Sequence, residues 1–314
     1  MNEEIILEIK ELTKYYRSYW TFSRLPAVND VSLKVSKGSV YGFLGRNGAG
    51  KTTTIKCILG LIHKNSGSVL FDSEELISAD QRSRIGYLPE QPYFYEHLSV
   101  LETLRFFAGL FGYSPKETKR RVERALHLVN LESRSKQRVR TLSKGLQQRL
   151  GVGQAILNSP ELLILDEPFS GLDPVGRREM RDLFELLKQE GSTLFMSSHI
   201  LSDIENLCTD IAIMESGTVK TTLDLSDRSL LNSDRSILRL NLEECSEEIK
   251  VKLLALSEDV QQRSNGDTIL RIDGEEAAQG ALSLCSQAAI RVSEFRRDSK
   301  TLEEVFLSHT NSTS

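Results

Sequence analysis

Residues 45–52 read GRNGAGKT, which matches the pattern G-x-x-x-x-G-K-[ST], and this motif constrains the fold more than any other segment. It follows an apolar run, Val40 to Leu44, and precedes a stretch of helical character, Thr53 to Leu59. A strand, a glycine-rich turn and a helix in this order direct backbone N–H groups toward phosphate oxygens at the helix N-terminus. The lysine adds positive charge at the β- and γ-phosphates, and the threonine hydroxyl binds Mg²⁺. The motif therefore predicts a nucleotide site formed by Gly45, Arg46, Asn47, Gly48, Ala49, Gly50, Lys51, Thr52 and Thr53, with Thr52 also a metal ligand.

Two carboxylates follow a second apolar run, Leu162 to Leu165. In proteins with a phosphate-binding loop, an acid at the end of a strand holds Mg²⁺, and we expect Asp166 to do so. The next residue, Glu167, would then lie near the γ-phosphate, where a carboxylate orients or deprotonates an attacking water. His199 follows another expected strand, and an imidazole there can donate to the γ-phosphate. We therefore predict Glu167 and His199 as catalytic residues.

Strands and helices alternate over the first 220 residues. Ser99 with Glu102, and Ser114 with Pro115, are helix-start signals. We expect strands at 5–9, 31–35, 40–44, 162–165, 192–197 and 210–214, and helices at 53–59, 99–130, 174–190 and from 200 onward. Alternating strands and helices predict an α/β fold with a mostly parallel sheet.

The pattern changes near residue 221, where a polar, serine-rich segment at 224–234 has the composition of a linker. Beyond it we expect strands at 237–242, 268–272 and 290–295, with helices at 245–257, 275–287 and 302–307. These elements suffice for a small α+β domain. The sequence therefore predicts two domains, residues 1–222 and 223–314.

Composition narrows the possible partners and location. The longest apolar runs are far shorter than the roughly 20 residues of a membrane-spanning helix. The acidic N-terminus does not resemble a signal peptide, so we expect the chain to stay in the compartment where it is made. Four widely spaced cysteines predict neither a zinc site nor a disulfide framework, which suits a reducing cytosol. The net charge of −4, with 11 basic and 17 acidic residues over 221–314, does not favour nucleic acid as a partner.

Several further segments, in the right order over residues 5–220, resemble the ATP-binding cassette of ABC transporters. Residues 142–149, LSKGLQQR, stand where that family carries its LSGGQ signature, and Ser143 lies 23 residues before Asp166. Residues 170–173, SGLD, resemble the D-loop, residues 198–199 the switch histidine, and residues 86–91, GYLPEQ, the Q-loop. Tyr16 matches the aromatic residue that stacks on adenine in the family.

This resemblance implies a P-loop NTPase core with a helical subdomain at about 91–160, which binds and hydrolyses ATP with Mg²⁺. It adds Tyr16, Ser143, Gly145 and Asp173 as nucleotide-binding residues and Gln91 as a metal-facing residue. Two positions stay open. Glu90 stands beside Gln91 and can take the Q-loop role instead, and Tyr19 or Trp20 can replace Tyr16 as the adenine-stacking ring.

The form of the signature, SKG followed by QQR, resembles the cassettes of ABC-2-type exporters, and residues 300–307, KTLEEVFL, resemble the end of drug-exporter subunits. The resemblance implies multi-span membrane (permease) subunits as partners. It also implies a second cassette, as a homodimer or a paralogue, and a peripheral location on the cytoplasmic face of the cell membrane. The alternatives are a soluble ABC ATPase acting on ribosomes or DNA, and a small-molecule kinase. The transported substrate cannot be deduced, because an ATPase subunit does not contact the cargo.

Overall fold

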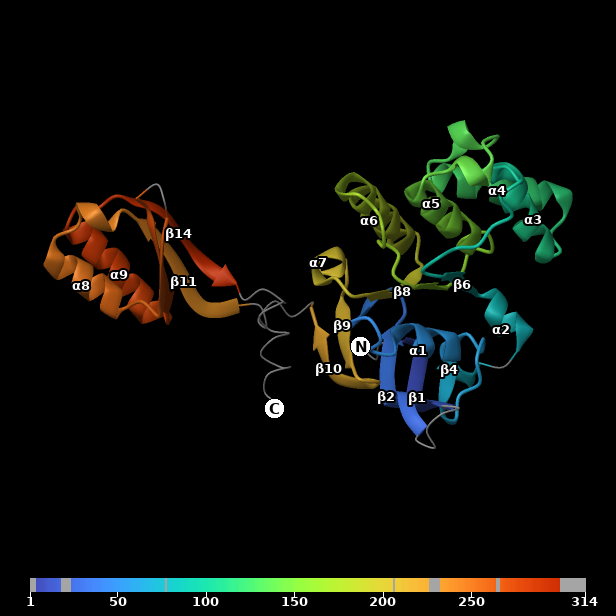
Figure 1. Cartoon of the computed structure of the whole chain (residues 1–314), viewed down its shortest axis with the longest axis horizontal. Helices are drawn as coiled ribbons and strands as arrows, with labels where there is room; N and C mark the ends of the chain where they lie inside the picture. The colour runs from blue at the N-terminus through green and yellow to red at the C-terminus, as the bar shows by residue number, and fades with distance from the viewer. Residues whose placement is uncertain are drawn as a thin grey trace. The chain divides into compact units, whose positions relative to one another are not determined.

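The computed structural model describes residues 4–17, 24–76, 78–205, 207–225, 232–263 and 266–299. The chain divides into two compact units, Met1–Ser226 and Asp227–Ser314 (Figure 1). The first unit contains the predicted phosphate-binding loop, two sheets and a group of helices. The second contains one sheet and two α-helices among the residues described.

A six-stranded sheet with the order β10-β9-β3-β8-β7-β6 forms the centre of the first unit. Its strands are β3 (Val40–Leu44), β6 (Ile85–Leu88), β7 (Leu162–Leu165), β8 (Thr193–Ser198), β9 (Asp210–Glu215) and β10 (Thr218–Asp224). All neighbours are parallel except β10, which is antiparallel to β9. Strands β3, β7 and β8 are buried along their whole length, which explains their nearly continuous apolar sequences. The predicted α/β fold with a mostly parallel sheet is confirmed.

The second sheet of this unit is antiparallel, with the order β2-β1-β4-β5. It consists of β1 (Ile5–Arg17), β2 (Arg24–Ser36), β4 (Ser66–Phe71) and β5 (Glu74–Glu75). Helix α1 (Lys51–Ile58) shares one apolar core with both sheets, because Ile55 and Ile58 pack with Leu7 and Val35 of the antiparallel sheet and with Phe43 of the central one. The sequence predicted only parts of β1 and β2 and missed β4 and β5.

Helices α3 (Val100–Leu110), α4 (Pro115–Leu128) and α5 (Lys144–Ala155) pack against one another within the predicted helical subdomain (Figure 1). Ser99 begins α3 with a complete capping box, and Ser114 caps α4. Both predicted helix starts are therefore confirmed, and the helical stretch predicted at 99–130 consists of two helices. Two short 3₁₀ turns, Glu132–Arg134 and Val139–Thr141, lead from α4 to α5. Outside this subdomain, the small helix α2 (Ala79–Ser83) precedes β6.

Two helices follow strands β7 and β8. Helix α6 (Pro174–Gln189), capped by Asp173, lies close to the predicted range 174–190 and buries one apolar face. Helix α7 (Leu201–Ile204) is a single turn, joined to α6 by an ion pair 2.8 Å long between Arg177 and Asp203. No helix in the described ranges is long and apolar enough to cross a membrane.

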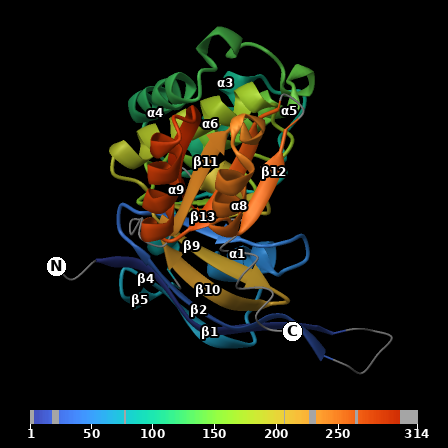
Figure 2. The ribbon, with the colours of Figure 1, turned by 90° about the vertical axis from the view of Figure 1, so that its left-hand side faces the viewer.

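The second unit has the order strand-helix-strand-strand-helix-strand, which is the ferredoxin-like arrangement. Its elements are β11 (Asn232–Leu240), α8 (Glu247–Ala255), β12 (Asp259–Gln262), β13 (Thr268–Asp273), α9 (Glu275–Gln287) and β14 (Val292–Ser299), with a 3₁₀ turn at Leu242–Glu244. The sheet is antiparallel with the order β12-β13-β11-β14, and α8 and α9 lie against one face of it (Figure 2). Side chains such as Leu238, Leu270 and Ala281 form its own apolar core.

The predicted linker at 224–234 is too long. Asp224 still pairs within β10, and β11 begins at Asn232, so both ends of the polar segment belong to strands. In β10 the polar residues lie on the edge strand of the central sheet, whereas β11 is an inner strand of its own sheet. The helix predicted at 302–307 lies outside the described residues.

Candidate functional site

The predicted phosphate-binding loop connects β3 directly to α1, as the sequence pattern requires. Gly50 has φ 110°, a conformation that favours glycine, and a Cβ there would lie 2.4 Å from the carbonyl oxygen of Ala27. A Cβ at Gly45 would lie 2.5 Å from the carbonyl oxygen of Met214. These two glycines let the loop pass close to neighbouring backbone and then turn into the helix.

The N-terminus of α1 opens into a cavity of ≈ 410 Å³. No side chain caps this helix end. Its first N–H groups therefore combine with the positive end of the helix dipole to favour an anion. The cavity is lined by residues of the loop and of the strand ends beside it: Ala27, Asn47, Gly48, Ala49, Gly50, Lys51, Thr52, Thr53, Glu90, Glu167, Ser170 and His199. Most of the predicted phosphate-binding residues therefore share one cavity.

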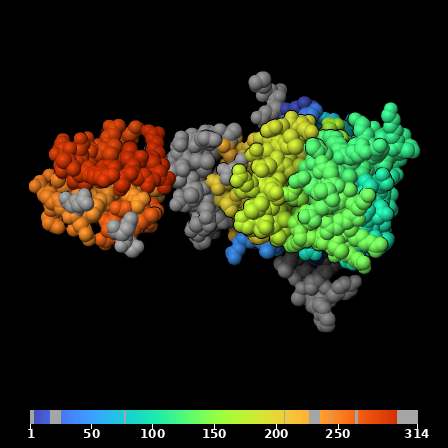
Figure 3. Space-filling view, turned by 90° about the horizontal axis from the view of Figure 1, so that it is seen from above, coloured from blue at the N-terminus to red at the C-terminus, as the bar shows by residue number. Residues whose placement is uncertain are grey.

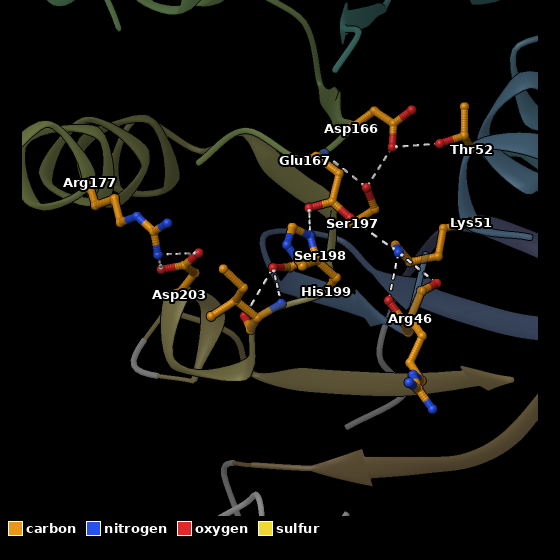
Figure 4. Close-up of polar contacts among 12 residues, drawn as sticks. Arg46, Lys51, Thr52, Asp166, Glu167, Arg177, Ser197, Ser198, His199 and Asp203 are labelled. Carbon is orange, nitrogen blue, oxygen red and sulfur yellow. Dashed lines mark hydrogen bonds and ion pairs between the residues drawn. The ribbon is translucent and has the colours of Figure 1, made fainter. Parts of the chain in front are cut away.

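Lys51 points back into its own loop (Figure 4). Its Nζ donates to the carbonyl oxygen of Gly45 at 2.6 Å and lies 3.4 Å from that of Arg46. The same Nζ lies 3.1 Å from Oε1 of Glu167 in an ion pair that lacks hydrogen-bond geometry. The ammonium is thus buried, and it is held by oxygens alone at the edge of the anion site.

The predicted metal ligands Asp166 and Thr52 lie next to each other. The Thr52 hydroxyl donates to Asp166 Oδ1 at 3.3 Å, and the hydroxyl of Ser197 donates to the same oxygen at 2.7 Å (Figure 4). Burial raises the pKa of Asp166, while the hydrogen bonds from Ser197 and Thr52 act in the opposite direction. A carboxylate and a hydroxyl beside an anion site are the hard oxygen ligands that Mg²⁺ prefers, so the residues present fit this ion.

Glu167 is fixed at several points. Its backbone has φ 49°, a left-handed conformation that is strained for a residue with a side chain. Its N–H donates to the Ser197 hydroxyl at 2.9 Å, and its Oε2 lies 2.7 Å from Nδ1 of His199. These contacts hold the carboxylate between Lys51 and His199, at the wall of the cavity (Figure 4).

Two residues of the cavity, Ala27 and Ser170, are not among the predicted site residues, and a third, Glu90, is the alternative that the sequence offers to Gln91. Both adjacent Q-loop candidates are exposed; Glu90 is among the residues that line the cavity, and Gln91 is not. Ser197, which joins Asp166 to the Glu167 backbone, was also missed; the signal available for it was a polar residue at the carboxyl end of a buried strand.

Tyr16 is not among the residues that line the cavity. Its side chain is 51% exposed, and the ammonium of Lys14 lies 5.3 Å from the centre of its ring. Tyr19 and Trp20 lie outside the described residues. The residue that stacks on adenine therefore stays a prediction.

Three other predicted nucleotide-binding residues, Ser143, Gly145 and Asp173, line a separate cavity of ≈ 310 Å³, whereas Gly45 and Arg46 line neither cavity. Ser143 caps α5 and accepts from the N–H of Leu146 at 3.4 Å, and Asp173 caps α6 and accepts from the N–H of Gly176 at 2.7 Å. Gly145 lies between these two helix ends in the same cavity. The two cavities share no lining residue, so the predicted site residues form two distinct groups.

Comparisons with known proteins show which proteins this chain is similar to. The family model described as ABC transporter matches residues 28–170. The bacitracin transport ATP-binding protein BcrA of Bacillus licheniformis is 36% identical over 307 residues, which are 96% of this chain and 96% of that protein. An uncharacterized ABC transporter ATP-binding protein of Synechocystis, sll0415, is 38% identical over 71% of this chain. That match spans 64% of the Synechocystis protein, which is less than two thirds of its length.

A solved structure with the description "Structure of ATP binding subunit of ABC transporter" resembles a large part of the chain. It is 34% identical, with a TM-score of 0.60, and the match covers 71% of this chain and 91% of the other. The similarity therefore covers most of that subunit and leaves about the length of the second unit unmatched.

Proposed function

The chain belongs to the ATP-binding proteins of ABC transporters, and we propose that it hydrolyses MgATP to drive an exporter whose membrane subunits are separate polypeptides. One observation carries the proposal. The carboxylate of Glu167 is held between Lys51 Nζ, at 3.1 Å, and His199 Nδ1, at 2.7 Å, in the cavity where the N-terminus of α1 opens. A fixed carboxylate beside an anion site is what water activation at a phosphate requires.

The residues divide the chemistry between them. Lys51 and the first N–H groups of α1 bind the β- and γ-phosphates of ATP. Thr52 and Asp166 would hold Mg²⁺, which neutralises phosphate charge when bound. Glu167 accepts a proton from the attacking water, whose oxygen bonds to the γ-phosphorus while the bond to the β-γ bridging oxygen breaks. His199 keeps the Glu167 carboxylate oriented toward this water.

We further propose that two cassettes combine head to tail. The second cavity places the hydroxyl of Ser143 and the backbone of Gly145 at the N-terminus of α5, another helix end that favours an anion. These residues share no cavity with Lys51, so they would complete the nucleotide site of another copy or of a paralogue. A cassette pair acting on membrane subunits would lie at the cytoplasmic face of the membrane.

The names of relatives support the transport role without defining a substrate. BcrA is named as a bacitracin transport protein, and it matches both units of this chain. We therefore propose that the second unit belongs to the transporter-coupled form of the cassette. The fold of this unit supplies no phosphate-binding loop of its own among the residues described.

A phosphate-release assay on the purified full-length chain tests the proposed function. We expect release of inorganic phosphate from ATP with Mg²⁺ and no added acceptor, and no release when EDTA removes the metal. A requirement for a small-molecule acceptor would indicate a kinase instead. Strong stimulation by ribosomes or DNA, without any by the cognate membrane subunits, would favour the soluble alternative.

A further inference from the structure

An ion pair of the first unit, formed by Arg177 of α6 and Asp203 of α7, lies outside both cavities. Nη1 of the arginine lies 2.8 Å from Oδ1 and 3.1 Å from Oδ2 of the carboxylate (Figure 4). Neither residue is among those that line the two cavities described above. The Asp203 side chain is only 7% exposed. A buried carboxylate needs a partner, so this pair fixes the two helices against each other.

The same guanidinium also reaches a turn at the second cavity. Nε of Arg177 donates to the carbonyl oxygen of Leu172 at 3.3 Å. Leu172 is buried and lines that cavity, next to Asp173, which caps α6. Arginine carries its donors in a rigid plane, so one side chain can hold a carbonyl and a carboxylate at a fixed separation. The position of Asp203 is therefore tied to the backbone of the second cavity.

On its other side, Asp203 belongs to the segment that follows His199. Helix α7 has four residues, and no side chain caps its start. A helix of this length is not stable by itself, so its place depends on packing. Ile204 is fully buried and packs over Gly42 of β3, and Asp203 supplies a second point of attachment. Two such points fix how this short helix is oriented on the sheet.

A hydrogen-bonded turn connects α7 to His199. The Ser198 hydroxyl donates to the carbonyl oxygen of Ile200 and accepts from its N–H, both at 3.0 Å. The N–H of Asp203 donates to the same carbonyl oxygen at 3.3 Å. The His199 side chain is 38% exposed, so packing alone does not fix it. A shift of α7 would therefore displace the imidazole, whose Nδ1 lies 2.7 Å from Oε2 of Glu167.

We propose that Arg177 and Asp203 are positioning residues for ATP hydrolysis. Through the backbone of α7 they hold His199 at the Glu167 carboxylate, and through Leu172 they tie that place to the second cavity. The pair acts through other residues, since it lines neither cavity. The inference rests on the proposed function, because the orientation of Glu167 affects turnover only if this carboxylate activates water.

Steady-state phosphate release and MgATP binding test the proposal on the purified full-length chain. We expect kcat of R177Q to fall about 10- to 100-fold, because a misplacement of about 1 Å costs on the order of 10² in rate. The KM and Kd for MgATP should stay within about twofold, because no residue of the first cavity is changed. R177K keeps the charge but not the planar set of donors, so its kcat should lie between the two.

A double variant separates position from stability. R177Q leaves the Asp203 carboxylate buried without its partner, which lowers the melting temperature by itself. R177M/D203L replaces both partners by apolar side chains, a change that is often neutral for stability. We expect this variant to melt close to the wild type and still to lose about 10- to 100-fold in kcat.

The matched control is R178Q. Helix α6 lies at the surface of the first unit, in the yellow region of Figure 3, and Arg178 is an exposed residue of this helix. Its replacement removes one positive charge beside Arg177 without touching the ion pair. The wild-type kcat and melting temperature should be kept.

The NMR signals of the histidine rings give a readout that does not depend on hydrolysis. The chain has five histidines, and comparison with H199Q identifies the signal of His199. We expect R177M/D203L to shift this signal and to leave those of the other four rings in place. R178Q should shift none of them.

Three results would overturn the proposal. The first is a full kcat in folded R177M/D203L, and the second is an equal loss of kcat in R178Q. The third is an unmoved His199 signal in R177M/D203L. If the wild type itself releases no phosphate, the proposed function fails, and the His199 signal still decides whether the pair positions the ring.

Discussion

Lys51 and Glu167 are bound to each other in the cavity, with Nζ 3.1 Å from Oε1 and only 5% and 7% of the two residues exposed. A buried charge requires a partner, and each of these groups supplies one for the other. The phosphates of ATP compete with Glu167 for the same ammonium. We infer that nucleotide binding moves Lys51 onto phosphate and thereby frees one carboxylate oxygen to act on water.

Replacement of Lys51 by alanine should weaken MgATP binding. Charge-assisted hydrogen bonds contribute about 1.5–3 kcal/mol each, so we expect a Kd about 10- to 100-fold higher. Lys56→Ala, on the exposed face of the same helix, is the matched control and should bind normally. Unchanged binding in Lys51→Ala, measured by calorimetry, would place the phosphates elsewhere.

Glu90 and Gln91 offer a paired test of the Q-loop position. Glu90 lines the cavity and Gln91 does not, so Glu90→Ala should lower the MgATP turnover about 10- to 100-fold, the range seen when an outer metal partner is lost. Gln91→Ala should change turnover little. The reverse order of effects in steady-state phosphate release would assign the role to Gln91.

Ser197 connects the two acidic residues, because its hydroxyl donates to Asp166 at 2.7 Å and accepts from the Glu167 N–H at 2.9 Å. Ser197→Ala leaves a buried N–H and a buried carboxylate each short of a partner. We expect a loss of about 1–3 kcal/mol in the free energy of unfolding, together with lower turnover. Ser192→Ala, at the start of the same strand region, has a single longer hydrogen bond of 3.3 Å and should be milder in both measurements.

The part of the site that the sequence reveals is the part formed by contiguous residues. The loop at 45–52 and the carboxylates after β7 are local patterns, and the structure brings them together because β3, β7 and β8 are near neighbours in a parallel sheet. Glu90 and Ser170 lie in the segments that resemble the Q-loop and the D-loop, but it is the packed structure that shows them lining the cavity. Ala27 reaches the cavity from a segment without a distinctive pattern, so its contribution depends on tertiary packing, which one sequence does not encode as a motif.

For the secondary structure, too, the elements with a clear local pattern were predicted and those without one were missed. Buried strands such as β7 are continuous apolar runs and were predicted, whereas β4, Ser66–Phe71, begins with three polar or small residues and was missed. Helix α5 packs so closely on β6 that a Cβ at Gly86 would lie 2.3 Å from the carbonyl oxygen of Ala155. Such an approach gives glycine its role, yet nothing in the local sequence distinguishes this glycine from one in a turn.

Residues 1–226 should fold without the second unit, because each unit has its own apolar core. We expect this fragment to melt cooperatively, to bind MgATP and to keep basal hydrolysis. Stimulation by membrane subunits, or pairing of cassettes, should be reduced. An insoluble fragment, or one that binds no nucleotide, would show that residues 227–314 stabilise the first unit.

The central claim is that Glu167 activates the water that attacks ATP in the cavity at the N-terminus of α1. Its most direct test compares the wild type and Glu167→Gln in MgATP binding and in phosphate release, using the same protein samples. Glutamine keeps the size of the side chain but cannot accept the proton, so we expect hydrolysis to fall about 10²- to 10⁴-fold. ATP binding should be retained or become tighter, because Lys51 loses its ion-pair partner. Near-normal phosphate release from Glu167→Gln would contradict the account.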